Sequence, residues 1–334
     1  MSRFYPLRLA PSWREKIWGS QDLSPLFGYQ SRRIGEVWYS FEANTITNGS
    51  WAGQTLRELM LRDSAGLMGN AFRPGSLPRR STGEAGRAKN STAPPYFPIL
   101  VKFLFTGDKL SVQVHPDDAY AREHEDGPGK TEMWYVSRAD PGACLALGLT
   151  TALTKDELRE VARSGEIARY LNWVEVKQGD AIFSPPGTLH SIGPGLALCE
   201  IQQNSDLTYR FFDFGRLGED GHPRPLHIDQ AVEVTRLELH GAPEQRVSFH
   251  RGDLKGETLL VCDYFAVERL SRSTSLVYPA DPSRMHLLVF LEGRGALGVE
   301  AYQPGDVYLI PAALPPCEWR PAEATVALRT YVPD

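Results

Sequence analysis

The chain has 334 residues and a formal net charge of −5, and 42% of its residues are hydrophobic. This length exceeds one average domain and the composition supports a buried core, so we expect packed globular units rather than disorder. The negative balance argues against a general nucleic-acid-binding surface, and no apolar run is long enough to predict a membrane span.

The N-terminus contains no uninterrupted apolar segment of the kind that marks a secretory signal, and we expect a cytoplasmic protein. The four cysteines are widely spaced and include no Cys-x-x-Cys pair: Cys144, Cys199, Cys262 and Cys317. This spacing predicts buried thiols rather than a zinc knuckle or a redox motif.

Residues 1–96 are expected to form a β-rich segment that packs on the first main unit, because residues 1–52 carry short strand-like runs. From Gly53 to about Phe72 the spacing of apolar residues indicates one or two turns of amphipathic helix. Residues 73–95 are rich in Pro, Gly, Ser and Arg, which predicts a mobile surface loop.

Residues 97–240 consist of short apolar runs separated by Gly, Pro and Asp, a pattern typical of the many strands of a β-sandwich or barrel. Thr154 and Glu157 have the spacing of a capping box, which predicts a helix running to about Arg163. A second helical piece is expected near residues 167–171 and a further helix over residues 227–239.

Residues 241–334 return to the strand pattern and are expected to form a second β-unit. The phrase GDAIFSP at residues 179–185 is matched by GDVYLIP at residues 305–311. A tandem pair of related β-barrels explains this internal match.

Metal-binding residue types occur in two spaced motifs of the first unit. Gln113 and His115 lie two residues apart on a predicted strand, so their side chains emerge on one face. The stretch from Gly179 to His190 has the spacing Gly-x5-Pro-x-Gly-x2-His, which resembles the second cupin motif. The first cupin motif, Gly-x5-His-x-His followed by Glu, is matched from Gly107, with Gln in the first His position and Glu132 as the acid.

These motifs predict one divalent metal in a cupin-type barrel, bound by Gln113, His115, Glu132 and His190. A set of two imidazoles, a carboxylate and an amide oxygen suits Zn²⁺, with iron, cobalt or manganese as alternatives. The competing interpretation is that the histidines are unrelated polar residues near turns, which would be preferred for one isolated histidine. The second unit has Ala313 and Pro316 at the corresponding positions, so no metal is expected there.

Longer motifs resemble type I mannose-6-phosphate isomerases, particularly their shorter bacterial form, over most of the chain. They are KIWG (16–19), IGEVWYS (34–40), LVKFLF (100–105), LSVQVHPDD (110–118), GKTEMWYV (129–136), PPGTLHSIG (185–193) and EIQQNSDLTYRFFDFGR (200–216). The resemblance implies a mainly β fold of tandem cupin-type jelly-roll barrels, the same four zinc ligands, and reversible conversion of mannose 6-phosphate to fructose 6-phosphate.

Matched motif by motif, the resemblance also implies an active site around the metal. Its catalytic residues would be Lys130, Asp206 and Arg210, and its substrate or phosphate contacts Ser111, Lys102 and, by a weaker match, Arg216. Gly129 stands where longer relatives have histidine, so the base that transfers the proton stays open.

Aldose–ketose isomerisation moves a proton from carbon 2 to carbon 1 through an enediol, which requires a base and stabilisation of a developing oxyanion. Arg210 would supply a permanently charged donor, although Asp206 and Arg210 on spacing alone would be a surface ion pair. Lys130 would act as a base if its pKa were lowered, or as a charged donor to an anionic oxygen.

Two other classes of function compete with the isomerase. One is a non-catalytic cupin that binds sugar phosphate or metal for regulation, which the joint presence of Lys130, Asp206 and Arg210 disfavours. The other is a cupin oxygenase with iron bound by two histidines and one carboxylate, which Gln113 fits less well. The expected partner is a phosphorylated hexose, the chain would be a monomer or homodimer, and no nucleic-acid or membrane partner is expected.

Overall fold

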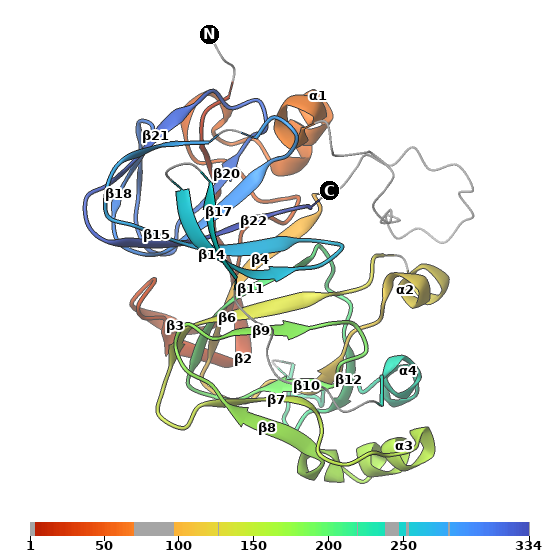
Figure 1. The fold of residues 1–334 in the computed structure, drawn as a ribbon. Coiled ribbons are helices and arrows are strands. Elements are labelled where there is room, and N and C mark those ends of the chain that lie inside the picture. Colours follow the sequence, from red (N-terminus) through yellow and green to blue (C-terminus); the bar gives the residue numbers. More distant parts are fainter. Residues whose placement is uncertain are drawn as a thin grey trace.

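The computed structural model describes residues 4–69, 97–125, 127–218, 220–237, 247–251, 254–279 and 281–333. Figure 1 shows two β-sheet units, with the C-terminal strands in one and the central strands in the other. This architecture confirms the predicted mainly β fold of tandem cupin-type units, each built from two sheets. The loop expected at residues 73–95 lies outside the described residues.

The first unit contains a six-stranded and a five-stranded antiparallel sheet. The six-stranded sheet has the order β2 (Ser12–Asp22), β3 (Tyr29–Trp38), β4 (Ile99–Thr106), β11 (Leu196–Gln203), β6 (Glu132–Ala139) and β9 (Ala181–Ser184). The five-stranded sheet has the order β12 (Tyr209–Phe212), β5 (Val112–Val114), β10 (His190–Ile192), β7 (Cys144–Leu149) and β8 (Leu171–Glu175).

The second unit repeats this plan with a seven-stranded and a four-stranded sheet. The larger sheet has the order β1 (Leu7–Arg8), β20 (Val307–Ile310), β17 (His286–Glu292), β22 (Thr325–Tyr331), β15 (Ala266–Arg272), β14 (Leu254–Val261) and β13 (Val247–Arg251). The smaller sheet has the order β16 (Leu276–Tyr278), β21 (Cys317–Pro321), β18 (Gly295–Leu297) and β19 (Glu300–Tyr302). The matched phrases lead into β9 and β20, which pair with β6 and β17 respectively.

The N-terminal strands are divided between the two units. Strands β2 and β3 extend the six-stranded sheet beside β4, whereas β1 pairs with β20 of the second unit, with Leu7 opposite Leu309. The N-terminal segment therefore contributes backbone pairing to both units and is not an appendage of one.

The helices in the described part of the chain are few and short. They are α1 (Leu56–Met68), α2 (Asp118–His124), α3 (Lys155–Arg163) and α4 (Ile228–Val234), with 3-10 turns η1 (Gly49–Trp51) and η2 (Glu166–Arg169). Thr154 and Glu157 form the predicted capping box of α3, because the Thr side chain accepts from the Glu157 N–H and Glu157 bonds back to Thr154. Helix α2 was not expected from the sequence. None of the helices in the described residues is long and apolar enough to cross a membrane.

The two large sheets pack on each other and form the main core. Alternate residues of β4 and β11 face in opposite directions, as the two-residue period of a strand requires. Phe103 and Cys199 belong to the core shared by both units, whereas Leu104 and Leu198 face the interior of the first unit. Lys102 and Glu200 have the same parity as Leu104 and Leu198, so the register directs these charged side chains into that interior.

Cys199 is the only buried thiol of the four cysteines; the other three are partly exposed.

Candidate active site

Three predicted metal ligands converge in the interior of the first unit. His115 follows β5, whereas Glu132 and His190 are the first residues of β6 and β10. Their imidazole and carboxylate atoms lie within 4.8 Å of one another. The Nε2 atoms of His115 and His190 are 3.4 Å and 3.3 Å from Oε1 of Glu132. All three side chains are buried, so the cluster has the compactness of a metal site.

Backbone pairing joins the two sequence motifs. His190 lies directly opposite Gln113 where β10 pairs with β5. The N–H of Gly187 donates to the carbonyl of His115 at 2.9 Å, in the turn that leads to His190. Gly187 has a φ of +82°, and an added Cβ would come within 2.8 Å of the Val234 carbonyl oxygen. A glycine is therefore required for this turn to bring the second motif against the first.

Hydrogen bonds to carbonyl groups orient both histidines. Nδ1 of His115 is 2.7 Å from the carbonyl oxygen of Leu207, and Nδ1 of His190 is 2.9 Å from that of Thr188. A carbonyl only accepts, so each Nδ1 carries the proton and each Nε2 keeps its lone pair toward Glu132. Burial lowers the pKa of His115 to about 4 and also lowers the pKa of His190. Both rings are therefore neutral near pH 7, as metal ligands must be.

The residues of this cluster fit a divalent cation. Both carboxylate oxygens of Glu132 are buried, and Oε1 has no hydrogen-bond partner among the described residues. The ammonium of Lys130 lies 2.6 Å from Glu132 and 3.1 Å from Nε2 of His115, so one positive charge lies beside this carboxylate and imidazole. Burial opposes ionisation of Glu132, but the charge of Lys130 outweighs it and holds the pKa of the carboxyl well below its usual value. An ionised carboxylate beside two neutral imidazoles is a donor set suited to zinc and its neighbours.

Gln113 lies at the edge of the cluster. Its amide nitrogen is 3.2 Å from Nε2 of His190, and its amide oxygen accepts from the hydroxyl of Ser111 at 3.0 Å. Only the oxygen of an amide can bind a cation, so ligation requires the amide to turn over. The structure thus places Gln113 at the expected position, with its nitrogen facing the histidine.

A cavity of about 250 Å³ opens beside the cluster. Its walls come from both sheets of the first unit and include Lys16 and Glu36 of β2 and β3. Of the residues predicted for the site, those in the lining are Lys102, Ser111, Gln113, Lys130, Asp206 and Arg210. Most of the residues predicted for the site therefore line one cavity.

A buried carboxylate that the sequence analysis missed lies among the cations of this cavity. Glu200 is 3.5 Å from Lys102 and 4.0 Å from Lys130, and it accepts from the indole N–H of Trp134 at 3.0 Å. Lys102 also lies 4.2 Å over the ring of Trp38, a cation–π contact. Glu200 could have been suspected because it opens a matched motif and falls opposite Lys102 once β4 and β11 are paired.

Arg210 enters the cavity from β12 and is held by two contacts. Its Nε donates to the hydroxyl of Ser111 at 3.2 Å, and Nη1 donates to the carbonyl of Pro225 at 2.9 Å. Asp206 pairs with Lys102 at 3.8 Å rather than with Arg210, and its side chain is 61% exposed. The ion pair between Asp206 and Arg210 that spacing alone suggested is therefore replaced by a pair between Asp206 and Lys102.

Arg216 does not line the cavity. Its guanidinium contacts the carboxylates of Asp108 at 3.2 Å and Asp213 at 2.7 Å, and it also donates to the carbonyl of Lys109. Two other residues from the same region, Arg224 and His227, do line the cavity, although the sequence analysis did not single them out. Both follow a Gly- and Asp-rich stretch that has no motif spacing, so no local signal singles them out.

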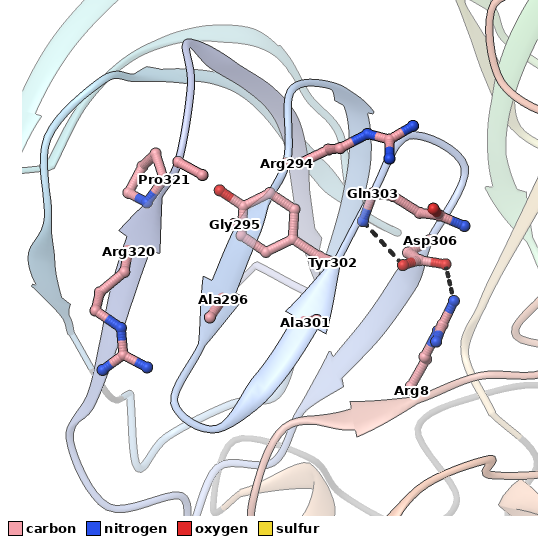
Figure 2. Close-up of a pocket in the computed structure, with 11 residues that line it drawn as sticks. Arg8, Arg294, Gly295, Ala296, Ala301, Tyr302, Gln303, Asp306, Arg320 and Pro321 are labelled. Carbon is pink, nitrogen blue, oxygen red and sulfur yellow. Dashed lines mark hydrogen bonds and ion pairs between the residues drawn. The ribbon is translucent and has the colours of Figure 1, made fainter.

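A larger hollow of about 640 Å³ lies in the second unit, away from the cluster (Figure 2). Figure 2 shows Arg8 directed at Asp306 and the backbone N–H of Gln303 bonded to the same carboxylate. The guanidinium of Arg8 lies 2.6 Å from that carboxylate. The exposed Arg294 and Arg320 lie on its flanks. This hollow contains no group of metal-ligating residues among those described, so we assign the chemistry to the smaller cavity.

Fold and site together define a cupin-type protein whose cluster of candidate metal ligands opens into a cation-lined cavity. The chain is 35% identical over 319 residues to mannose-6-phosphate isomerase of Streptococcus mutans, covering 92% of each chain. It is 37% identical over 325 residues to mannose-6-phosphate isomerase ManA of Bacillus subtilis, covering 92% of this chain and 94% of the relative. The chain therefore belongs to the mannose-6-phosphate isomerase family.

Solved structures agree with this assignment. The crystal structure of mannose 6-phosphate isomerase from Bacillus subtilis superimposes with a TM-score of 0.82 at 31% identity, covering 99% of both chains. A putative mannosephosphate isomerase from Archaeoglobus fulgidus gives a TM-score of 0.74 at 20% identity, which supports the fold alone. No model of a protein family matches the chain.

Proposed function

We propose that this chain is a metal-dependent aldose–ketose isomerase that interconverts mannose 6-phosphate and fructose 6-phosphate through an enediol. The observation that carries the proposal is the cluster of His115, Glu132 and His190 beside a cavity lined by cations. A site of this kind can bind a sugar phosphate and stabilise a developing oxyanion, which are the two requirements of the reaction. The relatives named as mannose-6-phosphate isomerases favour it over a regulatory cupin or an oxygenase.

We assign the metal to Gln113, His115, Glu132 and His190 and propose zinc, because neutral imidazoles with a carboxylate and an amide oxygen suit it. When bound, the ion supplies Lewis-acid polarisation of sugar or water oxygens. The carbonyls of Leu207 and Thr188 would keep Nε2 of both histidines available to it.

The protein's own cations are proposed to stabilise and orient the substrate. Arg210 offers a permanently charged donor to the oxygen that becomes negative in the enediolate. Lys130 is held between Glu132 and Glu200, which suits a charged donor to a sugar oxygen better than a free base. Lys102 and Ser111 are assigned to the substrate phosphate or its neighbouring hydroxyls, and Asp206 to positioning Lys102.

Proton transfer between carbon 2 and carbon 1 requires a group that can accept a proton and return it. We propose Glu200 for this role, because it is a buried carboxylate in the cavity lining and lies against Lys102 and Lys130. Trp134 fixes one of its oxygens by donating from the indole N–H. The other carboxylate of the lining near Lys102 is Asp206, which is mostly exposed and less able to exclude water.

The test is an isomerase assay with metal analysis on one purified sample. Mannose 6-phosphate should be converted to fructose 6-phosphate, activity should be lost on chelation, and added Zn²⁺ should restore it. Glucose 6-phosphate and unphosphorylated mannose serve as matched substrates for specificity. Sugar-phosphate binding without turnover in a fully metal-loaded sample would favour the regulatory cupin, and oxygen consumption would favour the oxygenase.

A further inference from the structure

The segment that follows β12 folds back along that strand and contributes to the cavity wall. The backbone N–H of His227 donates to the carbonyl of Arg210 at 2.8 Å, and the N–H of Arg210 donates to Nδ1 of His227 at 3.2 Å. Nη1 of Arg210 also donates to the Pro225 carbonyl. These three bonds fix the segment against β12 and bring Arg224 into the lining.

Asp213 orients the side chain of Arg224. Its carboxylate is buried, and it accepts from Nε of Arg224 at 2.7 Å and from Nη2 of the same guanidinium. A carboxylate that binds a guanidinium through both nitrogens fixes the plane of that group. The remaining nitrogen, Nη1, has no hydrogen bond to any residue in the described part of the chain, and the side chain is 25% exposed. Arg224 is thus held in a fixed orientation, and its Nη1 can still donate hydrogen bonds to a ligand.

Asp213 also binds Arg216, but the two arginines differ in their other contacts. Arg216 is engaged by Asp108, Asp213 and the carbonyl of Lys109 and does not line the cavity. Arg224 has Asp213 as its only ion-pair partner among the described residues, and it lines the cavity. Arg216 and Arg224 bind the same carboxylate, but only Arg224 lines the cavity. The effects of replacing each arginine on substrate binding can therefore be compared directly.

Arg210 and Arg224 place two positive charges on one cavity. Burial lowers the pKa of Arg210, and the nearby charge of Arg224 lowers it further. Asp213 is the one carboxylate that opposes this effect, and it also binds Arg216. Like charges that line one cavity are unfavourable unless an anion binds there. A phosphoryl group carries nearly two negative charges at neutral pH and offers several acceptor oxygens.

We propose that Arg224 binds the phosphoryl group of the sugar phosphate, and that Asp213 is the positioning residue that aims Arg224 at it. The inference rests on the proposed function for the identity of the substrate. It adds a residue from outside the family motifs and transfers the phosphate contact from Arg216 to Arg224.

The first test compares Arg224→Ala with Arg216→Ala as the matched control. Loss of a charge-assisted contact predicts that Arg224→Ala raises KM for mannose 6-phosphate by about 10- to 100-fold with kcat little changed. Arg216→Ala should change KM by less than about threefold, the size of effect expected for removing an ion pair distant from substrate. Arg224→Lys keeps the charge without the planar fork and should fall between wild type and Arg224→Ala. An unchanged KM in Arg224→Ala, or an equal rise in both alanine variants, would overturn the assignment.

A second measurement separates this inference from the proposed function. Metal-loaded protein is titrated with inorganic phosphate by calorimetry, and the affinity of Arg224→Ala is expected to be at least about tenfold weaker than that of wild type. A wild-type chain that binds phosphate through Arg224 but does not isomerise mannose 6-phosphate would refute the proposed function and keep the anion site. A wild-type isomerase whose Arg224→Ala variant binds phosphate normally would refute the anion site alone. The melting temperature and metal content of each variant identify any that fail to fold, and Arg224→Lys then replaces Arg224→Ala.

Discussion

Glu132 of the first unit and His286 of the second occupy the same position in their sheets. Each is the first residue of its strand, and each lies opposite the last residue of the neighbouring strand, Ser184 in β9 and Ile310 in β20. In the first unit this position carries a candidate metal ligand. In the second it carries a buried histidine whose Nδ1 is 2.9 Å from the hydroxyl of Tyr278. The second unit thus uses the position for internal packing.

Stability should fall at mildly acidic pH partly because of His286. Burial lowers the pKa of His286 below its usual value, although Asp281 opposes this, and Arg329, Glu268 and Tyr278 also face the ring. In the unfolded chain this histidine takes up a proton near pH 6.5, whereas in the folded chain it does so only at lower pH. The free energy of unfolding therefore decreases as the pH falls below about 6.5. His286→Gln should reduce this slope by up to about 1.4 kcal/mol per pH unit, measured by urea unfolding between pH 7.5 and 5.

The control for this measurement is His124→Gln, which replaces an exposed histidine on α2. It should leave the slope as in wild type. The buried His115 and His190 contribute to the same pH range, so all proteins are compared with metal bound. Equal slopes for His286→Gln and wild type would contradict the prediction.

His190→Ala should remove most of the metal and the activity. Replacement of even an indirect partner of a metal ligand costs about 10- to 100-fold in affinity, and loss of the ligand itself should cost at least that. No neighbouring side chain can substitute, because the turn from Pro185 fixes the position of this imidazole. Elemental analysis after dialysis gives the metal content, with His227→Ala as a control histidine in the cavity wall. Full metal occupancy in His190→Ala would refute the ligand assignment.

Arg210→Ala should keep the metal and the fold but lose about 10²- to 10³-fold in turnover, as expected when a preorganised oxyanion donor is removed. A guanidinium stays protonated and has no lone pair for a metal, so occupancy should not change. Steady-state kinetics and metal content are measured on one sample. If turnover stays at the wild-type value and KM rises, Arg210 contacts the phosphate instead of the oxyanion. If neither constant changes, the role of Arg210 is only its structural contact with Ser111.

Glu200→Gln should abolish proton transfer while preserving the shape of the site. The amide can still accept from Trp134, but it cannot carry a proton, so turnover should fall by about 10²- to 10⁴-fold. Exchange of the carbon-2 proton with deuterated solvent, followed by NMR, reports the step directly. Asp206→Asn is the matched control, because it alters the exposed carboxylate beside the same lysine. Undiminished exchange in Glu200→Gln would exclude this residue as the base.

The sequence was informative wherever function depends on short spacing. Gln113 and His115 share a strand face, and the turn from Pro185 to His190 has a fixed length, so the cluster of His115, Glu132 and His190 could be predicted from two spaced motifs. The capping box of Thr154 and Glu157 is likewise a local signal that predicted the start of α3 correctly. The repeated phrase at residues 179–185 and 305–311 predicted the tandem architecture, because each copy leads into an equivalent strand.

Long-range pairing was not predictable from these signals. Glu200 is a site residue because β11 pairs with β4 in a register that sets it opposite Lys102, and a shift of one residue would turn it toward the shared core. Arg224 reaches the cavity because hydrogen bonds from Arg210 fix the segment after β12. Helix α2 has seven residues, too few for a clear apolar period.

The pairing of β1 with β20 has a consequence for the order in which the protein can be made. Leu7 leaves the ribosome early, whereas its partner Leu309 is synthesised close to the end. The first unit, whose strands lie between residues 12 and 212, can assemble while translation continues. The second unit cannot complete its large sheet until nearly the whole chain has emerged, and β1 must remain unpaired until then. Ribosome-bound chains stalled before residue 307 should therefore leave Leu7 accessible to protease, and full-length chains should protect it.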